Sequence, residues 1–492
     1  MLITPREHVG NNHLARLIPQ AAAAGVHALR WSGPLTLTMH SEGGESSTVQ
    51  LQVTDVLQHL LAVPPSDLVR TAFTDEQPPV LVEHTSINPV HPVHLAALRG
   101  SLVGNAIVTA RRALGAEVTT AYFVNDLGKQ VRILVDAIRR GAHLDRRPDR
   151  VRFDRAVGVV YAAANMIEAK RWSDLGTLSA RFPWLADVLD VERLTRVPGD
   201  VETVADDDIR QDVVDRMTSA AAHDLSGLGI TIDRWEHESA LELPPVQRLA
   251  ALTHARTVRI NGTICASLPA GRIPLLRRDG VPFYFAKDVE NLRARPWTHM
   301  VHVVGNEQAF LQRELAQVAA RESKHLKVFG VGIVTVSGRS SSARQHRMIC
   351  VEDVEEDTGR DGLEALALGM LAVPRSAPLR LPLQRQPWVV KTQHRLRRMR
   401  TGLPSGSPSG DEAAVVELLT LLLRAPGIIK GVADRGNVHA IVFLLRSVLE
   451  ADERAGSARP DHIVAHTSAL VELLAKAAGI PPLDEIRRKE VP

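Results

Sequence analysis

The stretch from Val82 to Gln130 constrains the fold of this chain more than any other. It contains a short apolar strand, a loop dense in His, Asn and Pro, a helix that begins where the loop ends, and a second strand. This order is typical of a β-α-β unit, whose two strands are parallel. In an open parallel sheet, ligands bind beyond the carboxyl ends of the strands, where a helix N-terminus offers unpaired N–H groups to anions. We therefore expect the functional site to begin in this crossover.

Length and composition predict a soluble protein of more than one domain. A chain of 492 residues exceeds the usual size of a single hydrophobic core. Its 59 Lys and Arg nearly balance 56 Asp and Glu, so only local clusters would indicate a nucleic-acid partner. Cys265 and Cys350 lie far apart without metal-ligand spacing, and no stretch reaches the ~18 apolar residues of a membrane span. We expect a cytoplasmic protein with no disulfide framework, no structural metal and no membrane contact.

The chain is expected to have three parts. Residues 1–75 combine helical spacing with alternating apolar and polar segments, which predicts a small α+β module. Residues 76–375 predict an α/β domain with a parallel sheet, in which about 140–250 form a mostly helical insertion. Residues 376–492 contain the low-complexity linker TGLPSGSPSG and three long amphipathic helices, which predicts an all-α bundle.

Several segments, in the same order along the chain, resemble arginyl-tRNA synthetases, which are class I aminoacyl-tRNA synthetases. VEHTSINPVHPVHLAALR, at 82–99, is similar to the strand and loop that lead into the family's HIGH signature. YFVNDLGKQV, VPFYFAKDVENL, VVGNEQ and the C-terminal helices resemble later segments. The resemblance implies a class I Rossmann-like sheet, a helical anticodon-binding domain of the DALR type, and a monomeric, cytoplasmic arginine–tRNA ligase.

Three side chains support a pocket for arginine independently of the resemblance. A guanidinium needs planar acceptors and at least one carboxylate in fixed geometry, and Glu83, Tyr284 and Asp288 would supply them. Tyr284 and Asp288 are four residues apart, so they would face the same way on a helix. Taken singly, each carboxylate would be interpreted as a structural residue. Because several segments resemble the family in the same order along the chain, we prefer the interpretation that these carboxylates bind arginine. The resemblance adds Asn88 and Gln308 for the ammonium group and His94 for the carboxylate or phosphate.

The nucleotide half of the resemblance is altered. The resemblance implies ATP, with Mg²⁺, as cofactor, and the HIGH tetrad supplies two histidines and a glycine to it. Here the tetrad reads His94-Leu95-Ala96-Ala97. The Ala96 methyl would crowd a ligand lying against the backbone, and loss of the second imidazole would cost about 2–4 kcal/mol of transition-state stabilisation. His91 is a candidate substitute donor; a partly buried loop histidine is an equally good interpretation.

The second class signature, a mobile KMSK loop, is expected at 338–347, where the chain reads GRSSSARQHR. This segment has no lysine. Arg339, Arg344 and Arg347 keep the positive charge and are candidate phosphate ligands, with Arg339 and Arg344 preferred, although arginine differs from lysine in reach and geometry. The alternative is a solvated basic loop.

A basic cluster at 391–400 predicts contact with tRNA phosphates. A charged run on a helix is also typical of a solvated face. Because aromatic residues make up only 4 % of the chain, backbone contact is better supported than base stacking. The predicted tRNA-binding residues are Lys391, Arg395, Arg397, Arg398 and Arg400.

Three functions follow from this mixture of retained and altered motifs. The preferred one is a divergent arginine–tRNA ligase, which forms arginyl-adenylate and transfers arginine to the tRNA 3′ end. The second is a redirected ligase that joins arginine to a small molecule in a biosynthetic pathway. The third is a non-catalytic regulator that binds tRNA or arginine.

Overall fold

The computed structural model describes most of the chain. The described residues are 11–19, 26–41, 44–196, 207–241, 256–268, 271–278, 280, 282–336, 339–340, 349–381, 386–401 and 410–482.

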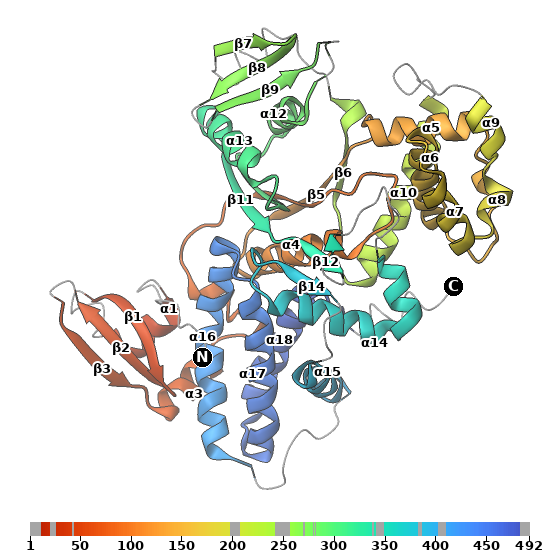
Figure 1. The fold of residues 1–492 in the computed structure, drawn as a ribbon. Helices are drawn as coiled ribbons and strands as arrows, with labels where there is room; N and C mark the ends of the chain where they lie inside the picture. Colours follow the sequence, from red (N-terminus) through yellow and green to blue (C-terminus); the bar gives the residue numbers. More distant parts are fainter. Residues whose placement is uncertain are drawn as a thin grey trace.

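A five-stranded sheet forms the centre of the molecule (Figure 1). All neighbouring strands are parallel, which confirms the predicted sheet and the β-α-β unit. In spatial order the strands are β11 (His325–Val331), β10 (His299–Gly305), β4 (Val80–Thr85), β5 (Val118–Val124) and β6 (Arg234–His237). From β4 the chain first adds β5 and β6 on one side and later β10 and β11 on the other. Such a reversal opens a crevice at the carboxyl ends of the two central strands.

Helix α4 (Leu95–Ala113) connects β4 to β5 and is apolar on nearly all sides, because it lies between the sheet and the C-terminal helices. Gly104 allows its close approach to β4: a Cβ added there would lie 2.0 Å from the Cβ of His84. The start of α4 is therefore held at a fixed position beyond the end of β4.

The insertion after β5 is helical, as predicted, and has its own hydrophobic core. Its helices are α5 (Lys129–Arg140), α6 (Phe153–Glu168), α7 (Trp172–Arg181), α8 (Leu185–Val188), α9 (Val191–Arg196) and α10 (Asp207–Gly227), with the 3₁₀ helix η3 (Leu144–Arg146). The chain then forms β6, a strand that the sequence did not indicate. Only four residues long, β6 shows too little periodicity to be recognised, and its pairing with β5 defines it.

A small antiparallel sheet follows, made of β7 (Arg256–Ile260), β8 (Thr263–Leu268) and β9 (Gly271–Leu276). The turn between β7 and β8 is Asn261-Gly262, both with positive φ, which suits a two-residue hairpin. The sequence Asp279-Gly280 after β9 is typical of a hairpin turn, but Asp279 lies outside the described residues. The apolar run after that turn forms an isolated bridge, Leu276 with Pro282, and then helix α12 (Tyr284–Ala294), so it is not a second hairpin strand.

The rest of the α/β part and the C-terminal part are mainly helical. Their elements are η4 (Glu238–Ala240), α13 (Ala309–Arg321), β12 (Val334–Val336), β13 (Arg339–Ser340), α14 (Val351–Ala372), β14 (Leu379–Leu381), α15 (Pro387–Arg400), α16 (Glu412–Arg435), α17 (His439–Ala455), η6 (Gly456–Ala458) and α18 (Asp461–Ala477). Helices α16, α17 and α18 pack against one another, as expected for a bundle.

The N-terminal part lies beside α16 (Figure 1). It contains α1 (Asn12–Leu17), β1 (Val26–Gly33), β2 (Thr36–Ser41), β3 (Ser46–Gln50), α3 (Val53–Leu61), η1 (Pro65–Asp67) and η2 (Arg70–Ala72). The backbone N–H of Leu35 donates to Thr420 Oγ1 of α16 at 2.9 Å. One hydrophobic core runs from Leu14 through the central sheet to Ile480, so these parts share their packing. Among the described helices, none is long and apolar enough to span a membrane.

Candidate functional site

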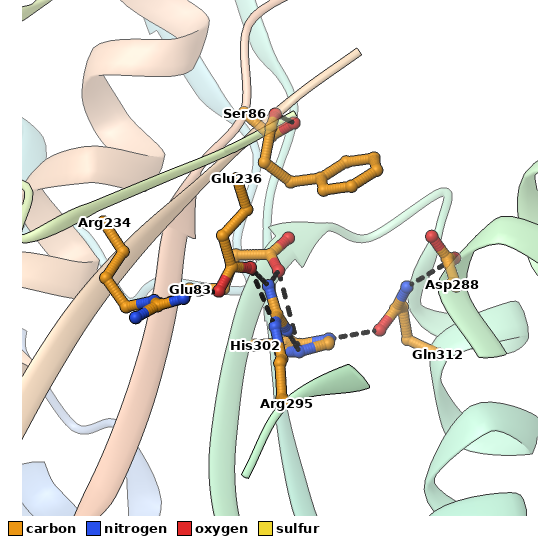
Figure 2. Close-up of polar contacts among 9 residues, drawn as sticks. Glu83, Ser86, Arg234, Glu236, Asp288, Arg295, His302 and Gln312 are labelled. Atoms are coloured by element: carbon orange, nitrogen blue, oxygen red, sulfur yellow. Dashed lines mark hydrogen bonds and ion pairs between the residues drawn. The ribbon is translucent and has the colours of Figure 1, made fainter. Parts of the chain in front are cut away.

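A buried guanidinium lies at the switch-point crevice, in contact with side chains of β4, β6 and β10. Arg295, at the C-terminal end of α12, is only 3 % exposed. Its Nε and one terminal nitrogen donate to Glu236 Oε2 at 2.9 and 2.6 Å, and the same terminal nitrogen contacts Glu83 Oε2. Figure 2 shows the two carboxylates meeting Arg295 from β4 and β6. Charge-assisted contacts of this kind fix geometry strongly.

The polar chain continues from Arg295 to Asp288 (Figure 2). The other terminal nitrogen of Arg295 lies 2.9 Å from His302 Nε2, and His302 Nδ1 lies 2.8 Å from Gln312 Oε1. Gln312 Nε2 then donates to Asp288 Oδ2 at 3.0 Å. Since Arg295 only donates, His302 accepts at Nε2 and carries its proton on Nδ1. Burial lowers the pKa of His302, which keeps this neutral tautomer.

The two carboxylates of the predicted pocket have opposite pKa shifts. Burial, reinforced by the neighbouring Glu83, raises the pKa of Asp288 to about 7, while Arg295 and Lys287 oppose this rise. For Glu83, burial also favours the neutral acid, but the charge of Arg295 and its hydrogen bond to Glu83 lower the pKa of Glu83 below the usual value. Glu83 is thus ionised at neutral pH, whereas Asp288 changes its charge near neutral pH.

A cavity of about 450 Å³ has several amide side chains in its lining. Asn88 Nδ2 donates to Gln130 Oε1 at 2.7 Å, and Asn125 Nδ2 donates to Asn88 Oδ1 at 3.2 Å. The buried Oδ1 of Asn125 has no hydrogen-bond partner within the described part of the chain. Tyr284, at the start of α12 and 61 % exposed, completes one wall. The cavity is of the size usual for small-ligand sites.

The structure separates the six predicted arginine-binding residues into groups. Asn88 and Tyr284 line the cavity, and Glu83 and Asp288 belong to the polar chain. Gln308 is exposed at the N-cap of α13. The sixth residue, His94, caps α4.

Sequence reasoning missed the residues that connect the two carboxylates. Gln312, one turn after Gln308, makes the contact with Asp288, and helical spacing from Gln308 could have indicated it. His302 pairs in register with Glu83 across β10 and β4, which only the sheet reveals. Arg295 and Glu236 had no local signal, since their pairing joins segments 59 residues apart.

His94 shapes the start of α4. Its Nδ1 accepts the Ala97 N–H at 3.2 Å, and burial lowers the pKa of His94 to about 4. The ring is therefore neutral at pH 7 and carries its proton on Nε2, which makes that nitrogen a donor. The Leu95 N–H donates to the Ile349 carbonyl at 3.0 Å, and the Leu98 N–H to the His94 carbonyl at 2.9 Å. The first turn of α4 has thus used most of its N–H groups internally.

The loop at the KMSK position ends against α4. Arg344 and Arg347 lie outside the described residues, and so does the side chain of Arg339, whose backbone begins β13. The described residues resume at Ile349. Cys350 forms an isolated β-bridge with His94, and the Val351 N–H donates to the Val93 carbonyl at 2.9 Å. The structure therefore brings the end of this loop to the altered HIGH tetrad.

His91 does not face the cavity directly. It is buried, and its ring packs edge to face against Tyr161 with centroids 5.0 Å apart, while Tyr161 lines the cavity. Substitution of His91 for the missing second histidine of the tetrad stays a prediction.

The predicted tRNA-binding residues of α15 hold this helix in place. Arg395 contacts Glu450 at 3.1 Å and Glu453 at 2.7 Å. Arg400 contacts Glu472 at 2.8 Å, and Arg397 pairs with Asp361. Arg398 is partly buried, and Lys391 is exposed. Three of the five side chains are thus engaged with carboxylates of α14, α17 and α18.

A second basic region lies on β7, β9 and the turn after β9. Residues 256–278 contain no Asp or Glu. In-register pairing of Ser267 with both Arg256 and Arg272 places these two arginines on one face of the sheet. Arg277 belongs to the lining of the cavity. The exposed arginines of this region are Arg256, Arg259, Arg272, Arg277 and Arg278.

The parallel sheet, its switch-point crevice and the position of His94 define a class I tRNA synthetase fold. The family model described as "tRNA synthetases class I (R), catalytic domain" matches residues 61–155. The chain is 25 % identical over 342 residues to an arginine–tRNA ligase of Saccharolobus solfataricus, which covers 56 % of this chain and 55 % of that protein. It is 27 % identical over 323 residues to an arginine–tRNA ligase of Micrococcus luteus, covering 61 % and 51 %. The chain spans about half the length of the curated relatives it matches.

Solved structures agree on the fold. An arginyl-tRNA synthetase from Thermus thermophilus matches with a TM-score of 0.65 at 17 % identity, covering 96 % of this chain and 99 % of that one. An arginyl-tRNA synthetase from Plasmodium falciparum matches with a TM-score of 0.61 at 14 % identity, covering 91 % and 85 %. The chain is therefore arginyl-tRNA synthetase-like in sequence and in fold, at distant identity.

Proposed function

We propose that this chain is an arginine–tRNA ligase that acts in the cytoplasm, as a monomer, on arginine, ATP and tRNA. One observation carries the proposal: Glu83 and Asp288, both matched to the family's arginine pocket, are joined in one polar chain at the switch-point crevice. The domain division at about 75 and 375 is part of the same proposal.

The charge of this crevice suits a cationic substrate. Glu83, Glu236 and Asp288 carry three negative charges when ionised. Arg295 offsets one of them, and Arg234, which pairs with Glu236 Oε1 at 3.3 Å, offsets a second. The Lys287–Glu238 ion pair, which lies beside Asp288, is neutral as a pair. One negative charge therefore remains for the guanidinium of arginine. Asp288 and the second oxygen of Glu83 are its acceptors, with Tyr284 at the exposed side.

The amide-lined cavity suits the amino-acid head group. An ammonium group needs acceptors, and Asn125 Oδ1 is a buried acceptor without a partner among the described residues. Asn88, hydrogen-bonded to Asn125 and Gln130, supports it. We assign Asn88 and Gln308 to this end of the substrate, as the family resemblance implies, and add Asn125.

The start of α4 fits an ATP phosphate through one donor. ATP, with Mg²⁺, supplies the α-phosphorus that the arginine carboxylate attacks, with pyrophosphate as the leaving group. His94 offers its Nε2–H to this phosphate, because its Nδ1 is occupied by the Ala97 N–H. Ala97 has no donor in its side chain, so His94 supplies the imidazole donor of the tetrad. Arg339 and Arg344 of the loop are the cations proposed to act with it. Among the described residues, no group of three His, Cys, Asp or Glu side chains is placed to hold a metal ion.

Transfer to tRNA completes the reaction: a 3′-terminal hydroxyl attacks the carbonyl carbon of the adenylate, and AMP leaves. The exposed arginines of β7 and β9 support a path for the phosphate backbone toward the cavity, because Arg277 is shared by both regions. Lys391 adds an exposed positive charge on α15. The arginines of α15 that are paired with carboxylates contribute less to tRNA binding.

Arginine-dependent exchange of pyrophosphate into ATP tests the proposal, measured with and without tRNA. We expect exchange with arginine and none with lysine, since only a guanidinium matches two planar acceptors. No exchange under either condition would refute adenylation. A tRNA gel shift without exchange would favour the non-catalytic regulator, and exchange without charging of any tRNA would favour the redirected ligase.

A further inference from the structure

Arg295 is the most connected side chain of the crevice, and nothing in the proposed reaction explains it. It lies after α12 and joins side chains of three strands: Glu83 on β4, Glu236 on β6 and His302 on β10. Arg295 contacts Glu83 at the oxygen Oε2. The orientation of Glu83 is therefore set by Arg295, and Oε1 is the oxygen turned away from it.

The charges around Asp288 show why a fixed cation matters there. Glu83 faces it from β4 and Glu238 from η4, and both disfavour a third negative charge. Lys287, on α12, is bound to Glu238, and Gln312, on α13, is neutral. Arg295 is then the cation that offsets Glu83. Without it, Glu83 and Asp288 would be two buried carboxylates with no cation between them, and this arrangement favours a proton on one of the two.

We propose that Arg295 is a positioning residue of the arginine pocket, an internal guanidinium that orients Glu83 and keeps Asp288 available as a carboxylate for the substrate. The assignment of the substrate rests on the function proposed above. A guanidinium inside the protein thus prepares the site for the guanidinium of the ligand: it occupies Oε2 of Glu83 and leaves Oε1 and Asp288.

Arg295→Met tests this role, with Arg293→Met as the matched control. Arg293 lies two residues earlier and pairs at 3.3 Å with Glu322, outside the crevice cluster. Arginine binding is measured by calorimetry from pH 5.5 to 9. We expect Arg293→Met to bind like the wild type. Arg295→Met should bind arginine at least tenfold more weakly at pH 7, and its affinity should reach half its maximum about one pH unit higher, because Asp288 ionises later.

Arg295→Lys separates charge from geometry. It keeps the cation but not the planar fork, so it should bind weakly with a pH midpoint near that of the wild type. A uniform loss of affinity in Arg295→Met, with no change of the pH midpoint, would mean that Arg295 only supports the fold and would overturn the proposal. Unchanged binding would overturn it as well.

A measurement without ligand distinguishes this inference from the proposed function. The side-chain carboxyl carbon of Asp288, assigned by comparison with Asp288→Asn, is titrated by ¹³C NMR in wild type and Arg295→Met. A higher midpoint in Arg295→Met supports the role of Arg295 even if the wild type binds no arginine, in which case the proposed function fails alone. If the wild type binds arginine but the titration midpoint of Asp288 is the same in wild type and Arg295→Met, the inference about Arg295 is overturned and the proposed function is not affected.

Discussion

Asp288→Asn is the sharpest test of the arginine pocket. Asparagine keeps the shape of the side chain and an oxygen that accepts from Gln312 Nε2, which lies 3.0 Å from Asp288 in the wild type. The substitution therefore removes charge with little change of packing. Because a hydrogen bond to a charged group contributes about 1.5–3 kcal/mol, we expect arginine affinity at pH 8 to fall about 15- to 150-fold.

The pH dependence sharpens this expectation. Because the pKa of Asp288 is raised to about 7, about one tenth of the carboxyl groups are ionised at pH 6 and about nine tenths at pH 8. Only the ionised form attracts the substrate cation. Wild-type affinity for arginine should therefore rise about tenfold between pH 6 and pH 8, while Asp288→Asn should show no such rise.

Isothermal titration calorimetry at pH 6, 7 and 8 provides the assay, with Glu290→Gln as the control. Glu290 lies on the same helix, two residues after Asp288, and its ion-pair contact is with Arg293 rather than with the crevice. This variant should retain both the affinity and its pH dependence. If Asp288→Asn binds arginine like the wild type at pH 8, the substrate does not contact Asp288 and the pocket has been placed wrongly.

Three further predictions concern stability, catalysis and RNA binding. Since folding raises the pKa of Asp288 to about 7, its protonated form favours the folded state, and this stability is lost as pH rises through 7; Asp288→Asn should raise Tm at pH 8 and not at pH 3.5. An equal shift in differential scanning fluorimetry at both pH values would contradict this sign. Ala97→His restores the second imidazole of the tetrad and should increase pyrophosphate exchange about 30-fold or more; a rate at or below that of the wild type would show that the start of α4 does not hold the phosphates. Arg272→Glu should weaken tRNA binding at least tenfold in fluorescence anisotropy and reduce its salt dependence, more than Lys391→Glu on α15; the reverse order would assign the RNA contact to α15.

Local patterns in the sequence determined the architecture. The strand, His-rich loop, helix and strand at 82–131 form a β-α-β unit because an apolar strand and a long apolar helix can be buried only against each other and further layers. The choice of site residues within this unit needed more: the family resemblance assigned Asn88 and His94, and the needs of a guanidinium pointed to Glu83.

Only the tertiary structure decided how these side chains are used. The four residues of β6 carry no clear periodicity, yet their pairing with β5 delivers Glu236 to the crevice. The basic run of α15 gave no sign of the carboxylates on other helices that engage Arg395 and Arg400. These ion pairs join residues far apart in the chain, and a short local stretch of sequence does not predict which distant residue will be the partner.

The crevice shows the same division. The sequence predicts that Glu83 and Asp288 are carboxylates of one pocket, because each lies in a segment that resembles the same family. It did not indicate that Arg295 lies between Glu83 and Glu236, or that His302 and Gln312 connect this cluster to Asp288. Residue type and local spacing determine which groups can bind a substrate, whereas packing of distant strands and helices determines which oxygens are already occupied and at what pH the remaining ones are charged.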